Sequence, residues 1–241
     1  MDFIQKSAVG GIFAAVMALG SMASAAPVTP EFSRFDNLTT LDNQQVTFGG
    51  SGIPTDSAAI TDFSVGGDRI RVGLIATPRF SSPALSNDGA GTYTAQPGES
   101  APGLSGWNFS FYAESAGDLA DAGLKLYYDL DPTAGNDLST LGYFDISALM
   151  PLSPDPSVFQ GSQNLGFGFL ASGAPGVVAP VPFPGAFDPF APGEYSCRIG
   201  VDGGPFAAIN VNVAAVPLPA GLPLLLGAVG GLALLRRRRK A

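Results

Sequence analysis

The chain has 241 residues with 20 acidic and 12 basic side chains, no histidine and one cysteine, and its formal net charge is -8. The missing histidine excludes a histidine-based catalytic triad and a histidine-ligated zinc or haem site, and the single cysteine excludes an internal disulfide framework. An acidic chain also lacks the basic face that phosphate contacts need, so we expect no nucleic-acid partner.

The first 25 residues are typical of a secretory signal peptide. A polar head with one basic residue, Lys6, precedes an almost wholly apolar run at residues 8–19. That run suits the hydrophobic helix of a signal peptide, whereas a membrane span needs about 20 apolar residues. We expect cleavage by signal peptidase and export of the rest of the chain, with an uncleaved N-terminal anchor as the alternative. The cleavage site is predicted from the small residues Ala23, Ala25 and Ala26.

Residues 26–215 are predicted to form one all-β ectodomain. Apolar and polar residues alternate with a period of two over residues 69–76, 107–113 and 124–128. Such alternation indicates half-buried strands of a sheet with one wet face. Turn-forming residues interrupt the chain about every 8 to 15 positions, which favours a β-sandwich of the Ig-like or jelly-roll-like kind. With Asp2, Lys6 and the five C-terminal cations removed, this region has 19 acidic and 6 basic residues and a net charge of -13.

The second half of this region carries a clear hairpin signal. Residues 195–201 and 207–213 alternate on either side of Asp202-Gly203-Gly204, and Asp-Gly tolerates the positive φ angles of tight turns. Cys197 falls in the apolar register, so we expect a buried thiol, with a reactive or cross-linking thiol as the alternative. Residues 164–170 place three apolar side chains on one side with glycines between them, which indicates the close approach of another backbone.

Helical segments of useful length are not predicted between the two ends of the chain. Single helical turns are expected at residues 118–122 and 147–150. The densest group of oxygen ligands is Asp129, Asp131 and Asp137, which could converge on Ca²⁺ together with backbone carbonyls. The spacing departs from that of an EF-hand, and the alternative is a plain turn between two strands, because Asp, Pro, Gly and Asn all favour turns.

Aromatic side chains are the other candidates for ligand binding. The alternation places Trp107 in the core, whereas Tyr112 and Tyr127 fall on the opposite faces of their strands and could stack on glycans, as could Tyr143. No pair of carboxylates stands out for glycoside hydrolysis, and Ser105 does not lie in a nucleophile elbow. We therefore predict no catalytic residues and no enzymatic activity.

The last 26 residues have the three parts of a sorting signal. A proline-containing motif precedes an uncharged stretch of 15 residues at 221–235, which is predicted to be a transmembrane helix. As a helix it is about 22 Å long, short for a bilayer core of about 30 Å, so part of the motif is expected at the interface. Basic residues stay on the cytoplasmic side. The motif is Val216, Pro217, Leu218, Pro219 and Ala220, and the basic membrane stop is Arg236, Arg237, Arg238, Arg239 and Lys240.

The prolines of this motif resist helix formation and keep it extended, the form in which proteases bind peptides. The apolar helix then holds the precursor in the membrane until the motif is cut and the tail is lost, while a plain C-terminal anchor with a proline-rich stalk is the alternative. The order of motif, glycine-rich helix and closing arginines resembles the VPLPA variety of PEP-CTERM sorting signals. The resemblance implies a Gram-negative bacterium and processing by a membrane-embedded exosortase, a cysteine-type transpeptidase-like enzyme.

These observations together predict an exported protein. Its precursor is expected to be anchored in the inner membrane, and its processed form at the cell surface or in the extracellular matrix, as a non-catalytic structural or binding protein without a cofactor. The processing enzymes are the expected partners. The alternative is a secreted carbohydrate-binding protein or carbohydrate-active enzyme on the same sandwich, with an extracellular polysaccharide as partner and calcium as the candidate ion.

Overall fold

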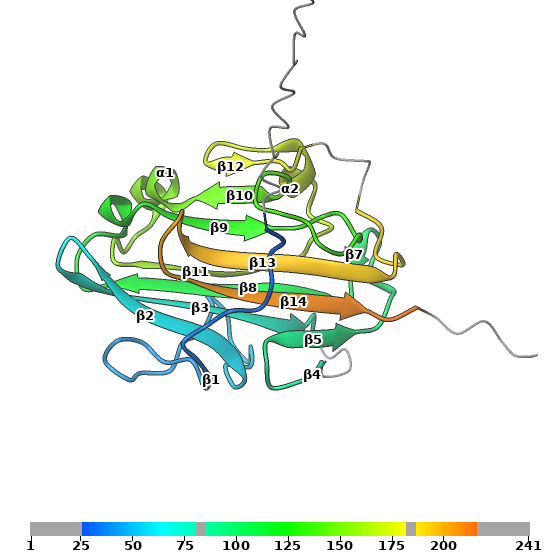
Figure 1. Ribbon diagram of the computed structural model, residues 1–241, viewed down its shortest axis with the longest axis horizontal. Helices are drawn as coiled ribbons and strands as arrows, with labels where there is room; N and C mark the ends of the chain where they lie inside the picture. Colours follow the sequence, from blue (N-terminus) through cyan, green and yellow to red (C-terminus); the bar gives the residue numbers. More distant parts are fainter. Residues whose placement is uncertain (1–25, 81–84, 182–186, 216–241) are drawn as a thin grey trace, which may run out of the picture.

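Two β-sheets pack face to face in the computed structural model, which describes residues 26–80, 85–181 and 187–215 (Figure 1). The five-stranded sheet comprises, in spatial order, β1 (Arg34–Asp36), β2 (Ala58–Val65), β3 (Asp68–Pro78), β8 (Trp107–Ser115) and β11 (Val158–Gln163). The seven-stranded sheet comprises, in spatial order, β12 (Val177–Val178), β10 (Gly142–Asp145), β9 (Leu124–Tyr128), β13 (Gly193–Val201), β14 (Phe206–Val213), β5 (Thr92–Ala95) and β4 (Ser86–Asn87). The predicted all-β sandwich is therefore confirmed at the level of two packed sheets.

The core between the sheets is built largely from aromatic side chains. On β8, Trp107, Phe109 and Phe111 all point inward and are at most 2% exposed. From the opposite sheet Tyr128 stacks on Phe109, with ring centroids 6.3 Å apart, and Phe144 lies 6.0 Å from Phe111. The alternation in residues 107–113 thus correctly predicts which side chains form the core, because successive side chains of a strand point to opposite faces.

The predicted hairpin is β13 and β14. Their antiparallel register runs from Gly193 opposite Val213 to Gly200 opposite Phe206, and Gly203 in the turn has a φ of 68°. Cys197 is fully buried, as predicted. Strand pairs in both sheets are antiparallel, except that β14 also runs parallel to β5.

Short helices and one small hairpin connect the strands. A 3-10 turn, η1 (Leu119–Ala122), is capped by Asp118, and α1 (Ile146–Leu149) is capped by Asp145 and leads into η2 (Met150–Leu152). Both single turns expected from the sequence are therefore confirmed. The small hairpin consists of β6 (Glu99–Ala101) and β7 (Leu104–Ser105).

Residues 164–170 are not a strand. They leave β11 through a turn and enter α2 (Gly168–Ser172). The predicted close approach of another backbone is nevertheless confirmed, because a side chain at Gly166 would overlap the carbonyl oxygen of Gly103.

The prediction of one wet face per sheet is wrong, because chain segments cover part of both outer faces. Residues 27–32, drawn in blue in Figure 1, cross β13 and β14 before the chain enters β1 in the other sheet. Glu31 of this segment and Ala208 of β14 form two backbone hydrogen bonds, in which each N–H donates to the other residue's carbonyl. Residues 37–57, which we call the crossing segment, cover part of the outer face of the five-stranded sheet, where the side chain of Leu38 lies over Gly73 of β3. Both segments separate alternating strand residues from water.

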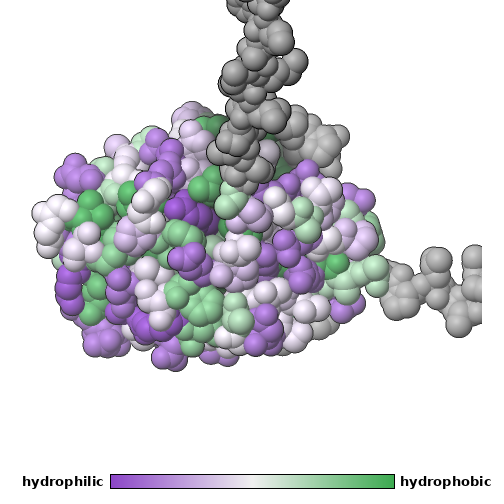
Figure 2. Space-filling model, viewed as in Figure 1, coloured by the Kyte–Doolittle hydropathy of each residue, from purple (hydrophilic) through white to green (hydrophobic). Residues whose placement is uncertain are grey.

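Both predicted terminal signals lie outside the described residues, the signal helix in residues 1–25 and the C-terminal helix in residues 221–235. Within the ranges that the structure describes, no helix has the length and apolar character needed to cross a bilayer. Polar and apolar residues are interspersed over the face of the seven-stranded sheet that Figure 2 shows.

Candidate functional site

The predicted processing sites lie at or beyond the ends of the described chain. Ala26 is exposed at the start of the described residues, and Ala23 and Ala25 precede it. The motif at residues 216–220 and the basic stop at residues 236–240 lie outside the described residues, so these assignments stay predictions. On the body side, β14 ends at Val213. The motif therefore follows the last core strand almost directly in the sequence.

The aspartate-rich loop that follows β9 is closed by its own hydrogen bonds. Asp129, which is 3% exposed, accepts from the backbone N–H of Asp131 at 2.9 Å and from the Asn136 amide at 3.0 Å. The same amide donates to the carbonyls of Asp131 and Thr133. Burial raises the pKa of Asp129 to about 6. These contacts are those of a well-packed turn.

The structure does not gather the three proposed calcium ligands into a cluster. Asp137 accepts from the backbone N–H of Ser139 at 2.7 Å and from the Ser139 hydroxyl. One of its carboxylate oxygens is therefore already used within the turn. In the part of the chain that the structure describes, no group of three or more acidic or cysteine side chains could hold a metal ion. The turn is the alternative that these contacts favour for Asp129, Asp131 and Asp137.

The two tyrosines predicted to be exposed are buried. Tyr112 is 2% exposed and Tyr127 is 5% exposed. The strand alternation places them on the outer faces, as predicted. The crossing segment reaches Tyr112, because Leu41 of that segment and the Tyr112 hydroxyl donate to the same carboxylate oxygen of Glu114. Residues of the N-terminal segment, including Val28, pack with Tyr127. Tyr143 is half-buried, with its ring 5.5 Å from that of Tyr127. Neither Tyr112 nor Tyr127 can stack on a glycan in this fold.

Ser105 and Cys197 are also buried. The hydroxyl of Ser105 donates to the carbonyl of Trp107 at 2.6 Å, and the residue is 1% exposed. Burial raises the pKa of the Cys197 thiol well above its ordinary value. A thiol needs a lowered pKa and access to react, so Cys197 is an inert core residue here.

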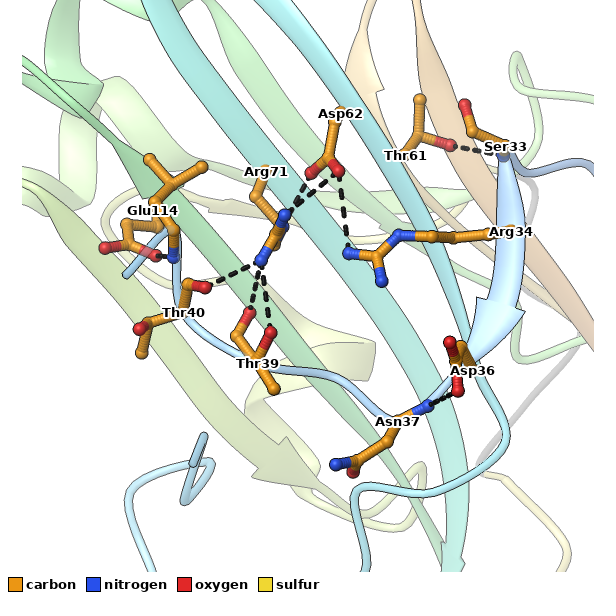
Figure 3. Close-up of polar contacts among 11 residues, drawn as sticks. Ser33, Arg34, Asp36, Asn37, Thr39, Thr40, Thr61, Asp62, Arg71 and Glu114 are labelled. Carbon is orange, nitrogen blue, oxygen red and sulfur yellow. Dashed lines mark hydrogen bonds and ion pairs between the residues drawn. The ribbon is translucent and has the colours of Figure 1, made fainter. Parts of the chain in front are cut away.

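The outer face of the five-stranded sheet holds the crossing segment through a half-buried arginine (Figure 3). Arg71 of β3 forms an ion pair with Asp62 of β2 at 2.6 Å, and it also donates to the carbonyls of Thr39 at 3.1 Å and Thr40 at 2.6 Å. Glu114 of β8 accepts from the backbone N–H of the next residue of the segment, Leu41. The hydrogen bond with Asp62 raises the pKa of Arg71, so this anchor stays charged.

Beyond the crossing segment, the same outer face carries a row of hydroxyl and amide side chains. Thr77 of β3 and Ser110 of β8 share a hydrogen bond of 3.2 Å, and Ser110 donates to Ser162 of β11 at 2.9 Å. Asn108 of β8 also donates to Ser162, at 3.1 Å, and accepts from Asn164 at 2.8 Å. Thr77, Ser110 and Asn164 are buried, so this polar row is part of the folded sheet and its geometry is set by strand register.

A cavity of about 390 Å³ opens above this polar row, and we call it the Arg79 cavity. The Arg79 guanidinium lies 4.7 Å from the ring centroid of Phe80 and 5.5 Å from that of Phe167. Phe80 is 76% exposed and has a φ of 57°, a conformation rare for a bulky residue. The cavity is lined by Ser51, Gly52, Ile53, Pro54, Thr77, Pro78, Arg79, Phe80, Asn108 and Ser162.

This cavity was not predicted from the sequence. Its lining comes from the crossing segment and three strands that are distant in sequence, so no short motif contains it. The one local signal is Pro78-Arg79-Phe80, in which a proline ends a strand and a cation stands beside an aromatic residue. Comparison of the chain with protein-family models, with curated proteins and with solved structures finds no match.

Proposed function

We propose that the protein is exported, held in the inner membrane as a precursor, processed by an exosortase and then displayed at the cell surface or released into the extracellular matrix. The observation that carries this proposal is the order of motif, apolar stretch and basic block in residues 216–241. The folded body supports it, because the motif begins within three residues of the end of β14. A processing enzyme would therefore separate a complete β body from its membrane helix.

We propose that this body is a non-catalytic structural or binding domain, an Ig-like or jelly-roll-like sandwich within the two-sheet class. Ser105 and Cys197 are both buried, so neither side chain is accessible to a substrate in this fold. The alternative is a secreted carbohydrate-active enzyme on the same sandwich. Turnover of acidic polysaccharides by the purified protein would favour that alternative.

Intact mass of the protein from its native host tests the processing proposal. We expect the wild-type protein to lack residues 1–25 and 221–241, and the double variant Pro217→Ala, Pro219→Ala to keep the C-terminal residues, because the extended motif is lost. The matched control is Pro154→Ala, Pro156→Ala, which changes two exposed prolines of the body at the same spacing. This control should be processed like the wild type. Retention of residues 221–241 by wild type and motif variant alike would refute sorting.

A further inference from the structure

We propose that the Arg79 cavity binds a uronic acid residue of an acidic oligosaccharide. The inference deepens the binding role proposed above and rests on it only for the presence of such a ligand outside the cell. The cavity of about 390 Å³ lies within the range of about 300 to 1,000 Å³ that is usual for small-molecule sites. Three features of its lining identify the ligand class, namely charge, hydrogen-bond donors and an aromatic face.

The charge of the lining is opposite to that of the body. Residues 26–215 carry 19 carboxylates and 6 cations. None of those carboxylates lines this cavity, whereas Asp155, Glu99 and Asp56 line the other three cavities described. An anionic group can therefore approach Arg79 without meeting a carboxylate in the wall.

Arg79 also has no anionic partner among the described residues. Four of the six cations of residues 26–215 form ion pairs, Arg34 and Arg71 with Asp62, and Lys125 and Arg198 with Asp202. Arg79 forms no ion pair with any described residue, and its Nε is buried without a hydrogen-bond partner among those residues. A guanidinium presents paired N–H groups that match the two oxygens of a carboxylate.

The floor of the cavity offers further donors. The Ser162 hydroxyl oxygen accepts from both Asn108 and Ser110, at 3.1 Å and 2.9 Å, so its own O–H is left to donate. Asn108 uses one amide hydrogen on Ser162 and has a second. Donors beside a guanidinium suit a ligand that combines a carboxylate with several hydroxyl oxygens, as a uronic acid does.

Phe80 supplies an apolar face beside these polar groups. The residue is 76% exposed, its ring centroid lies 4.7 Å from the Arg79 guanidinium, and its backbone has a φ of 57°. Such a conformation costs free energy and is found preferentially at functional sites. The C–H face of a pyranose ring can pack on the exposed aromatic ring while its carboxylate meets Arg79.

Calorimetric titration of the full-length chain in detergent tests the proposal. The probes are a tetramer of galacturonic acid and the same tetramer with every carboxylate methyl-esterified, which keeps the rings and hydroxyls and removes the charge. We expect the acid to bind at least about tenfold more tightly than the ester, because a charge-assisted bidentate pair is lost. Arg79→Gln should weaken binding of the acid by a similar factor.

Matched controls separate this site from general electrostatics. Arg69→Gln removes the same charge from an exposed arginine at the other end of β3 and should leave binding unchanged. The cationic tail is present in every variant, so binding by the tail would survive Arg79→Gln. Phe80→Tyr should retain affinity and Phe80→Ala should lose it, with urea unfolding of each variant as the check on folding.

Several results would overturn the proposal. These are no binding of the acid tetramer by the wild type, equal binding of acid and ester, or equal losses from Arg79→Gln and Arg69→Gln. Equal affinity for tetraglutamate would show recognition of carboxylates without the sugar and would overturn the ligand class. None of these results depends on cleavage of the tail, so failure here and failure of the processing proposal are distinguishable.

Discussion

Asp62 on β2 accepts two hydrogen bonds from Arg71 on β3, at 2.6 Å and 3.0 Å, in a register where the two residues lie directly opposite each other. The arginine side chain is only 12% exposed, because the crossing segment lies over it. Its remaining N–H groups reach the backbone of that segment. One arginine thus joins two strands to the chain that covers them.

Replacing this arginine should release the crossing segment. Arg71→Met keeps most of the apolar length but removes the donors to Asp62, Thr39 and Thr40. We expect a loss of about 2 to 3 kcal/mol in the free energy of unfolding, since carbonyls covered by the fold lose charged donors. Urea denaturation measures it. Arg69 is exposed on the same strand, so Arg69→Met is the control and should change the free energy of unfolding by less than about 0.5 kcal/mol. Equal midpoints for the two variants would contradict the anchoring role.

The buried hydroxyl of Tyr112 should contribute to stability. It donates to Glu114 at 2.8 Å, and Glu114 in turn accepts from Leu41 of the crossing segment. Tyr112→Phe removes one hydrogen bond to a charged group, so we expect a loss of about 1.5 kcal/mol or more. Tyr143→Phe, at a half-buried position, is the control and should be close to neutral. Unfolding curves in urea compare the two, and an unaffected Tyr112→Phe would mean that this bond adds nothing.

Asp129 should make stability fall as the pH rises. Burial raises its pKa from 3.8 to about 6 in the folded state. The folded state therefore holds a proton that the unfolded state has lost, and between about pH 4 and pH 6 each pH unit removes up to about 1.4 kcal/mol. Asp88, Asp137, Asp155 and Asp202 have lowered pKa values and act in the opposite direction.

The difference between variant and wild type isolates this contribution. The variant Asp129→Asn has no titratable group at this position. The free energy of unfolding of the variant, relative to that of the wild type, should therefore increase as the pH rises from 4 to 7, even if the variant is less stable at every pH. Urea unfolding at several pH values measures that difference. A constant difference across the range would show that Asp129 does not titrate in this window.

Gly166 should tolerate no side chain. A Cβ there would overlap the carbonyl oxygen of Gly103, which is a backbone atom and cannot swing aside as the end of a flexible side chain could. We expect Gly166→Ala to cost about 2 kcal/mol or more, as strained overpacking does. Gly168→Ala, two residues later, is the control, because nothing lies within 4 Å of its added Cβ. Thermal unfolding measures both variants, and equal melting temperatures for Gly166→Ala and Gly168→Ala would contradict the predicted overlap at Gly166.

The local predictions that held have a common physical basis. The hairpin of β13 and β14 follows from period-two alternation around an Asp-Gly turn, and the buried Cys197 follows from the same register. Trp107 is buried for the same reason. These features depend on neighbours in the sequence, which is why a single sequence is enough to predict them.

The predictions that failed depended on distant segments. Tyr112 and Tyr127 do lie on the outer faces of their strands, but alternation cannot reveal which other part of the chain will cover those faces. Strand β2 and the crossing segment were not predicted. The buried apolar residues of the crossing segment, such as Leu38 and Phe48, do not recur with the period of a strand or a helix.

By itself, the sequence determined the β class, the core register and the turns, because these depend on periodicity and turn chemistry among neighbouring residues. Export and processing are proposed from the order of apolar and charged residues at the two ends of the chain. The tertiary structure alone decided which tyrosines are buried, that the three loop aspartates do not gather, and that Arg79, Phe80, Asn108 and Ser162 line one cavity. The physical reason is that strand pairing and the path of the covering segments join residues more than 50 positions apart, as Asn108 and Ser162 are.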